Sequence, residues 1–443
     1  MPGYIKSNQL VGLLLVNFAL AATFEIFEPD EVQTVPIVGF NVIAAFFQNL
    51  LKLFRGDAFR VWNGAVDIAK PQSVSQVKST STWMEVTAES LEGWSRRLEA
   101  ESCSYHQFPY WVKAYEKQGY RPKFFFFGDH DNPVAFVAVI EVGIYPFRFG
   151  LIDRGPVVFE TGTDNTAVYL SALNQLAKQR GYVFLRFTQG QEDVYSLIQN
   201  AENVISTEPY PFCRDSRNSL LVEQIADDEE LISGFSHTAR RDIRRAQRFE
   251  YEIRIASSET EFEMAWKLFS QRAAKKGFEL SSKPRAFWHS IVKAGSSGRL
   301  ARLYLCMYEG ELIAAQLNVR DGNTCEVTLA ALDIEALKDK PSPAALLYWI
   351  AMRDGYKEGC RYFNMGGPGD PKRNNHLFEF KRKFKPTLNV APEPLCLVLA
   401  PLRYHLWINV LLRGWRAWRY RFGKSKRKPL PQPQTRTEKF NNK

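Results

Sequence analysis

Several patterns that identify common enzyme classes are missing from this sequence of 443 residues. Its six cysteines and six histidines are scattered, with no CxxC pair and no HExxH arrangement, which argues against a zinc site and a disulfide scaffold. It has no GxxxxGKS/T loop, no GxGxxG after a strand and no GxSxG turn, which excludes the nucleotide-binding and hydrolase classes that depend on them. Widely spaced thiols in apolar runs fit a reducing cytosol, and we expect no metal.

Acidic residues are too few to balance the basic ones. The chain has 58 Lys and Arg against 48 Asp and Glu, which gives a net charge of +10. Such a charge favours anionic partners: nucleic acid, nucleotide ligands or an anionic membrane surface. Hydrophobic residues make up 45% of the chain, which is ample for packed cores.

The two ends of the chain have compositions of their own. Leu10–Phe24 and Val35–Leu51 are apolar but shorter than the roughly 20 residues of a membrane span. The alternatives are a membrane-associated hairpin, a packed extension, a secretory signal-like segment and a wrongly assigned start. Leu397–Phe422 alternates Leu, Trp and Arg, and a basic tail follows at Lys424–Lys428. This pattern predicts an amphipathic helix, either on an anionic membrane or docked across a domain junction.

Between these ends, one order of elements occurs twice: a helix, two or three antiparallel strands, a helix and a strand. This repetition predicts two copies of one α+β unit. In the first copy we expect helices at Tyr105–Gly119 and Thr166–Arg180 and strands at Lys123–Phe127, Val134–Ile144 and Tyr182–Phe187. In the second we expect helices at Glu261–Lys276 and Pro343–Lys357 and strands at Ala301–Tyr308, Leu312–Val319, Thr324–Leu332 and Tyr362–Met365.

An unusually basic helix is predicted at Ser236–Phe249. At 100° per residue, five arginines fall on one arc of roughly 140°, and small or apolar residues fill much of the opposite side. Only Asp242 interrupts the run, and it points away from that arc. A face of this kind suits a phosphate-bearing ligand that arginine can bind with two hydrogen bonds. The alternative is a solvated face paired with acids such as Asp227–Glu230. The arginines are Arg240, Arg241, Arg244, Arg245 and Arg248.

Two glycine-bearing segments have the composition of binding sites. Asp153–Pro156 follows an apolar run, and Phe363–Gly369 places paired glycines after a short strand. Glycines let a backbone approach a ligand closely and leave N–H groups available to an anion. Further on, Lys381 and Lys383 alternate with Phe380 and Phe384, and a lysine there could stabilise an oxyanion. The alternatives are a simple turn for the first segment and an edge strand for the second.

In order and spacing these segments resemble the Fem family of peptidoglycan-bridge aminoacyltransferases, over about Tyr105 to Lys385. The matching pieces are His106-Gln107-Phe108-x-x-Trp111, Arg154-Gly155-Pro156, the ArgArg-x-IleArgArgAla helix, and Asn364-x-Gly366-Gly367 leading to Phe380-Lys381-x-x-Phe384. The resemblance implies an α+β fold with two GNAT-like domains in tandem. We expect an apolar extension at 1–66, a linker at 67–82, the two domains at 83–225 and 226–390, and a helical, basic C-terminal region at 391–443.

The resemblance also implies an activity. The amine of a nucleotide- or lipid-linked muropeptide, or of a related envelope precursor, attacks the ester carbonyl of an aminoacyl-tRNA. No cofactor is needed beyond this co-substrate, or an acyl-CoA in its place. The chain would act in the cytoplasm or on the inner face of the plasma membrane. The implied catalytic residues are Lys381, Phe380 and Glu160, and the implied substrate-binding residues are Arg154, Arg240, Arg241, Arg244, Arg245, Asn364, Gly366, Gly367 and Lys383.

The sequence departs from the family pattern in two places. Members of the family often carry an Asp just after the GlyProVal turn, where this chain has Val158, Phe159 and Glu160. Ser258–Gly295 is also too short for the long helical arm with which some members engage tRNA. The sequence does not favour an acyl-CoA donor either, because it lacks the glycine loop with which GNAT acetyltransferases hold the pyrophosphate of coenzyme A. A non-catalytic protein that binds an envelope precursor or RNA therefore stays as the third alternative.

Overall fold

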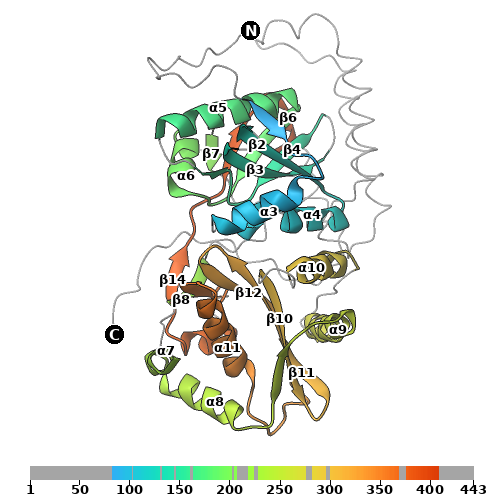
Figure 1. Cartoon of the computed structure of the whole chain (residues 1–443), viewed down its shortest axis with the longest axis vertical. Coiled ribbons are helices and arrows are strands. Elements are labelled where there is room, and N and C mark those ends of the chain that lie inside the picture. Colours follow the sequence, from blue (N-terminus) through green and yellow to red (C-terminus); the bar gives the residue numbers. More distant parts are fainter. Residues whose placement is uncertain are drawn as a thin grey trace, which may run out of the picture. The chain divides into compact units, whose positions relative to one another are not determined.

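The computed structural model describes residues 82–408 apart from ten short gaps: 102, 130–131, 144–145, 160–162, 202–203, 207–217, 224–227, 276–281, 296–299 and 369–375. Two mixed β-sheets organise this part of the chain, and each is the centre of one lobe (Figure 1). The tandem α+β arrangement expected from the sequence is therefore confirmed. The apolar segments before residue 82, Glu160 and most of the C-terminal region lie outside the described residues.

The first lobe is built on the strand order β1-β2-β3-β4-β6-β15-β7, and the short β5 pairs with β3. Helices α5 and α6 cover one face of this sheet, and α3 and α4 lie on the other (Figure 1). The elements are β1 (Trp83–Glu85), α3 (Leu91–Ala100), the 3-10 turn η2 (Tyr105–Gln107), α4 (Pro109–Ala114), η3 (Tyr115–Gln118), β2 (Arg121–Gly128), β3 (Pro133–Val142), β4 (Arg148–Ile152), β5 (Val157–Val158), α5 (Thr163–Gln179), β6 (Tyr182–Phe187), α6 (Glu192–Gln199) and β7 (Val204–Ser206).

The second lobe has the order β14-β8-β13-β12-β11-β10-β9. Helix α11 covers one face of the sheet, and α9 and α10 lie on the other (Figure 1). The elements are β8 (Asn218–Glu223), α7 (Asp228–Gly234), α8 (His237–Gln247), β9 (Glu252–Ile255), α9 (Glu259–Lys275), α10 (Ser282–Gly295), β10 (Ala301–Tyr308), β11 (Glu311–Asp321), β12 (Thr324–Leu332), α11 (Ala344–Lys357), β13 (Tyr362–Asn364), α12 (His376–Arg382) and β14 (Thr387–Val390).

Local sequence signals explain why several elements begin and end where they do. The hairpin between β10 and β11 turns on Glu309 and Gly310, whose φ angles of 49° and 81° give the left-handed two-residue turn expected from the sequence. Gly181, with a φ of 71°, follows α5 as predicted. The predicted helix at Tyr105–Gly119 is instead three short pieces. Proline has no N–H and disfavours helical backbone in the residue before it, so Pro109 starts α4 and Phe108 is extended.

The domain boundaries differ from those expected. Strand β8, which the boundary at 225/226 assigned to the first domain, pairs with β13 and β14 in the second sheet. Strand β15 (Leu395–Val398), which was assigned to the C-terminal helical region, lies between β6 and β7 in the first sheet. Sequence patterns do not reveal this because pairing partners are set by tertiary contacts. The predicted helix at Leu397–Phe422 begins later, with α13 (Pro401–His405), and continues as a π-helical turn to residue 408; the rest lies outside the described residues.

The side chain of Gln107 bridges the turn between β4 and β5 and the strand β3. It makes the hydrogen bonds that a neighbouring strand would otherwise make. Its carboxamide oxygen accepts the N–H of Ala138 at 2.8 Å, and its nitrogen donates to the carbonyl of Asp153 at 2.6 Å. Gln107 has no exposed surface. A Cβ at Gly155 would lie only 2.4–2.6 Å from the carboxamide atoms. Gly155 is therefore required so that Gln107 can complete the sheet.

We expect Gly155→Ala to lower the free energy of unfolding by about 2–4 kcal/mol, because the new methyl group displaces Gln107 and breaks two buried hydrogen bonds. Urea denaturation followed by circular dichroism measures this change. Gly93→Ala is the matched control, since a Cβ at Gly93 meets nothing within 4 Å. Equal stability of the two variants would contradict this role of Gly155.

None of the helices within 82–408 that the structure describes is both long and apolar enough to cross a membrane.

Candidate active site

A buried lysine is the centre of the candidate site in the second lobe. Lys381, on α12, is only 5% exposed, and its Nζ donates to the carbonyl oxygen of Gly367 at 2.8 Å. Asn364, at the end of β13, accepts the N–H of Gly366 on its Oδ1 at 2.8 Å. Gly366 has a φ of 74°, and a Cβ there would lie 3.6 Å from the ammonium. Four of the residues expected from the sequence therefore form one site: Asn364, Gly366, Gly367 and Lys381.

The environment of Lys381 changes its acidity. Burial penalises the charged form and lowers the pKa of the ammonium to about 8. Next to it along α12, the ring of Phe380 packs against Tyr348 and Phe384 with centroids 5.2 and 5.4 Å away. Phe380 thus contributes to the apolar surroundings of α12. The segment is a helix and not the edge strand considered as an alternative.

The site lies where two parallel strands separate. β12 and β13 pair over three residues only, ending with Glu326 beside Asn364, while β12 continues to Leu332. Beyond this pair, Val327 O lies 3.9 Å from the Cβ position of Gly366. Glu326 was not singled out in the sequence, because its place beside Asn364 depends on strand register, which single-strand patterns do not show. The end of the ladder brings backbone groups, an amide and an ammonium to one place, and such groups can bind a substrate carbonyl or amide.

The rate of acyl transfer should depend on pH through the protonation state of Lys381. If its cation stabilises an oxyanion, the active form is the protonated one, which predominates below the pKa of about 8. We expect kcat/KM to fall by about tenfold per pH unit above that value. Initial rates of acyl transfer from pH 6 to 10 measure this profile. A rate that rises with pH through 8 would indicate that the neutral amine acts as a base.

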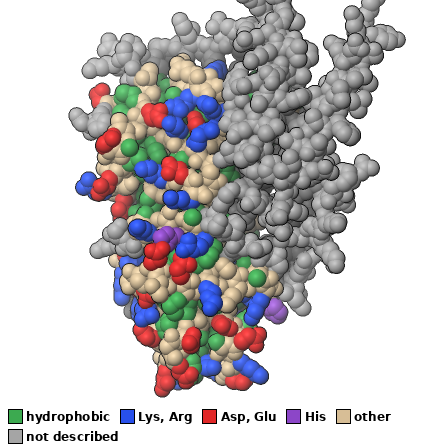
Figure 2. Space-filling model, turned by 90° about the vertical axis from the view of Figure 1, so that its right-hand side faces the viewer, with side chains coloured by type: hydrophobic (Ala, Val, Ile, Leu, Met, Phe, Trp, Pro, Cys, Tyr) green, Lys and Arg blue, Asp and Glu red, His purple; other side chains and the backbone are tan. Residues whose placement is uncertain are grey.

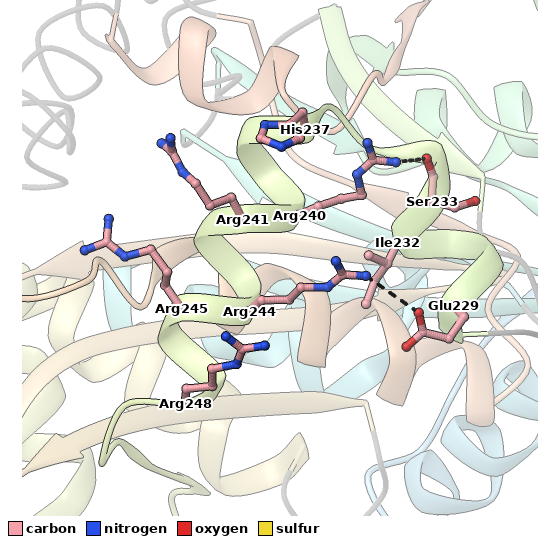
Figure 3. A pocket seen from close by; sticks show the side chains of 9 residues that line it. All are labelled: Glu229, Ile232, Ser233, His237, Arg240, Arg241, Arg244, Arg245 and Arg248. Atoms are coloured by element: carbon pink, nitrogen blue, oxygen red, sulfur yellow. Dashed lines mark hydrogen bonds and ion pairs between the residues drawn. The ribbon is translucent and has the colours of Figure 1, made fainter.

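The arginine helix forms a separate pocket with α7. It begins as expected, because the Ser236 hydroxyl accepts the N–H of Ala239 at 3.2 Å, and Ala239, Ile243 and Ala246 are buried in the core. The pocket has a volume of about 460 Å³. In Figure 3, Arg240 and Arg244 point from α8 toward Ser233 and Glu229, whereas Arg241 and Arg245 extend in the opposite direction. The lining of the pocket consists of Glu229, Ile232, Ser233, His237, Arg240, Arg241, Arg244, Arg245 and Arg248.

Few acids balance these arginines. Arg240 donates to the carbonyl of Ser233 at 3.1 Å, and Arg244 is 4.0 Å from Glu229 in a pair that is largely exposed. Among the described residues, neither Arg245 nor Arg248 has an ion-pair partner. On the face of the molecule seen in Figure 2, by contrast, basic and acidic side chains are interspersed. The positive charge of the pocket is therefore only partly compensated, by Glu229 and by the pair of Arg241 with Asp242, and it suits an anion with several oxygens.

The pocket and the lysine site are linked through Lys383. Its Nζ is 3.2 Å from Oδ2 of Asp242, and its carbonyl accepts the N–H of Ser236 at 2.8 Å. Asp242 was expected to point away from the arginine arc, but its other carboxylate oxygen, Oδ1, is also 3.5 Å from Nη2 of Arg241. Lys383, expected to bind substrate, holds the end of α12 against the start of α8. These contacts fix the position of the helix that carries Lys381.

Arg154 belongs to the first lobe. It has a φ of 53°, and its N–H donates to the hydroxyl of Thr188 at 2.9 Å. Its role in substrate binding stays a prediction, as does the role of Glu160 outside the described residues.

Comparisons with known proteins bear on the fold that carries this site. Residues 233–382 match the family model described as an acetyltransferase (GNAT) domain. The solved structure titled "Crystal structure of FemX" matches with 13% sequence identity and a TM-score of 0.61. The match covers 73% of this chain and 99% of the FemX chain. No curated protein sequence matches the chain.

Two further solved structures are less similar. The C-terminal domain of a lysylphosphatidylglycerol synthetase, described as putative, from Agrobacterium fabrum has 14% identity and a TM-score of 0.46, and covers 73% of this chain and 96% of its own. A tandem GNAT protein from the clavulanic acid biosynthesis pathway has 11% identity and a TM-score of 0.42, and covers 72% of this chain and 99% of its own. The resemblance seen in the sequence is thus confirmed for the fold and supports an acyltransferase: the chain has the tandem GNAT-like fold of FemX.

Proposed function

We propose that this protein is an N-acyltransferase that moves an aminoacyl group from aminoacyl-tRNA to the amine of a peptidoglycan precursor or a related envelope acceptor. The observation that carries the proposal is the buried ammonium of Lys381 beside the Gly366-Gly367 turn, 2.8 Å from the carbonyl of Gly367. A cation in a site shielded from water stabilises a developing negative charge far better than one on the surface does.

The chemical step requires such a cation. The acceptor nitrogen attacks the ester carbonyl carbon, a C–N bond forms, and the carbonyl oxygen becomes an oxyanion that Lys381 stabilises. The C–O ester bond then breaks, the ribose hydroxyl leaves with a proton, and the nitrogen loses its proton. Glu160 is the residue that the family resemblance implies for moving this proton.

The choice of acceptor in this proposal is based on the arginine pocket. A nucleotide- or lipid-linked muropeptide carries a diphosphate, whose oxygens match several guanidiniums within one pocket of about 460 Å³. The three exposed arginines whose side chains have no ion pair or only a weak one are Arg244, Arg245 and Arg248. The pocket thus has the charge and the donors for the diphosphate.

An acyl-CoA donor is the second candidate, and the match of residues 233–382 to a GNAT acetyltransferase domain favours it. Purified protein incubated with UDP-muropeptide and radiolabelled aminoacyl-tRNA or acyl-CoA separates the candidates. Label transferred from aminoacyl-tRNA supports the first, and label transferred from acyl-CoA supports the second. Binding of UDP-muropeptide without transfer from either donor would support a non-catalytic binding protein instead.

A further inference from the structure

A second buried cation lies in the first lobe, where none of the chemistry above uses it. Arg186, on β6, is only 1% exposed and is among the largest fully buried side chains of the chain. Its strand neighbours Leu185 and Phe187 belong to the apolar core of this lobe. Because side chains alternate along a strand, Arg186 points to the opposite face of the sheet. It lies in register between Leu151 of β4 and Cys396 of β15.

Arg186 has no partner for this charge. Its Nε and Nη2 are buried, and neither forms a hydrogen bond with any described residue; no described carboxylate forms an ion pair with it. Two nearby arginines have more partners. Arg180, in the turn before β6, pairs with Glu85 and Glu141, and Arg148, on β4, donates from Nη1 to the carbonyl of Arg180, although its Nε is also buried without a hydrogen bond. A buried guanidinium without an anion is costly. Its retention calls for an anion from outside the lobe.

The unpaired atoms define the shape of that anion. Nε and Nη2 form one edge of the guanidinium, with two N–H bonds directed the same way. Elsewhere in this protein the same edge binds carboxylates. Arg285 uses Nε and Nη2 to hold both oxygens of Glu263, and Arg361 uses the same two atoms, at 3.1 and 2.8 Å, to hold Glu223. The open edge of Arg186 therefore fits a planar anion with two oxygens.

Arg186 is the second-last residue of β6, and the paired strand β4 ends at Ile152, just before the glycine turn of the first lobe. Two residues further on, Thr188 donates its N–H to the carbonyl of Ile152 and accepts the N–H of Arg154 on its hydroxyl. Asp153 and Arg154 are half-buried, in contrast to the strand interiors on either side. The glycine turn thus adjoins the ends of the two strands that carry Arg186 and its register partner Leu151.

We propose that Arg186 is the inner end of a binding subsite for a carboxylate of the substrate. This inference rests on the proposed function, because the stem peptide of a muropeptide acceptor carries such groups. A carboxylate fits better than a phosphate, since the cost of burying an anion rises steeply with its charge and a carboxylate carries only one. The subsite is distinct from the arginine pocket, which lies on α7 and α8 of the other lobe.

Calorimetric titration with L-alanyl-γ-D-glutamyl-L-lysine and with its fully amidated analogue tests the inference. We expect the wild-type chain to bind the free acid about 10- to 150-fold more tightly than the amide, because two charge-assisted hydrogen bonds are lost with the amide. Arg186→Met should abolish this preference. Arg186→Lys keeps the charge but has no two-donor edge, so it should strongly reduce the preference for the free acid. If Arg186→Met does not fold, the preference measured with Arg186→Lys is the test.

The control is Arg148→Met, which removes an arginine of the neighbouring strand β4, in register with Tyr182 at the start of β6, and should keep the preference. A second readout is stability without ligand: Arg186→Met should melt at or above the wild-type temperature, whereas loss of a structurally paired arginine lowers it. An unchanged preference in Arg186→Met and Arg186→Lys would overturn the proposal. So would binding of inorganic phosphate, and not of the peptide acid, that depends on Arg186.

These results are independent of the acyl-transfer assay. Transfer without a preference for the free acid would disprove the carboxylate subsite alone. A preference that depends on Arg186, found in a chain that transfers no acyl group, would disprove the proposed reaction and leave the subsite in place.

Discussion

Lys381→Met is expected to lower kcat by about 100- to 1000-fold while the protein still folds and binds its acceptor, because one stabiliser of the oxyanion is lost. Methionine has nearly the length of lysine and fills the same apolar surroundings without the charge. Single-turnover acyl transfer measures the rate, and calorimetric titration with UDP-muropeptide measures binding. A change in Kd with an unchanged kcat would show that Lys381 binds substrate and does not act on the transition state.

The same substitution should stabilise the protein. The pKa of Lys381 is lowered from 10.5 to about 8, so at neutral pH the folded state carries a buried charge that the unfolded state solvates. This difference amounts to about 3 kcal/mol, and losing the hydrogen bond to Gly367 offsets about 1 kcal/mol of it. In the wild type, stability should rise from pH 8 to 10.5, because the unfolded state binds more protons in this range. Lys381→Met should lack that rise.

Lys383→Met is the matched control. This lysine is two residues away on the same segment, but it is partly exposed and paired with Asp242. Its loss should cost at most about 1 kcal/mol of stability and leave kcat within a few-fold of the wild type. Near-normal turnover in Lys381→Met, together with slow turnover in Lys383→Met, would assign the catalytic role to Lys383.

The double replacement of Arg241 and Arg244 by alanine should weaken binding of UDP-muropeptide by about 1–3 kcal/mol, or about 5- to 150-fold in Kd. Both side chains line the pocket and are more than half exposed, so water and salt reduce what each contributes. The loss should therefore shrink as ionic strength rises. Titration at low and high salt measures both quantities.

Arg254→Ala is the control for the overall loss of positive charge. This arginine is similarly exposed, but it lies on β9 and is paired with Glu252 and Glu261, away from the pocket. Its removal should leave the affinity for UDP-muropeptide within about twofold of the wild type, because surface ion pairs contribute little. An equal loss of affinity in Arg254→Ala and in the double variant would mean that net charge attracts the ligand and the pocket does not bind it.

Much of the fold could be predicted because its signals are local. The hairpin at Glu309-Gly310, the capped arginine helix and the alternation of helices with strands are all set by residues close together in the chain. The grouping of Asn364, Gly366, Gly367 and Lys381 followed from the family resemblance. Residue patterns alone left α12 open between strand and helix, since a run of seven residues is too short to show its period.

The features that could not be predicted all depend on distant partners. Gln107 completes a sheet through Ala138 and Asp153, 31 and 46 residues away. Arg186 lies in a run of strand residues, YVFLRF, in which an arginine would be placed on the solvent side. One of the two strands beside it, β15, comes from more than 200 residues later in the chain.

That late strand also determines the order in which the two lobes can be completed during synthesis. The strands of the second sheet run without interruption from residue 218 to 390, so that lobe can close as soon as it leaves the ribosome. The first sheet must wait for Leu395–Val398, and until then β6 has an open edge and β7 has no neighbour. A chain cut after Pro394 would keep this edge open permanently. The lobe that is translated first is thus the one that is finished last.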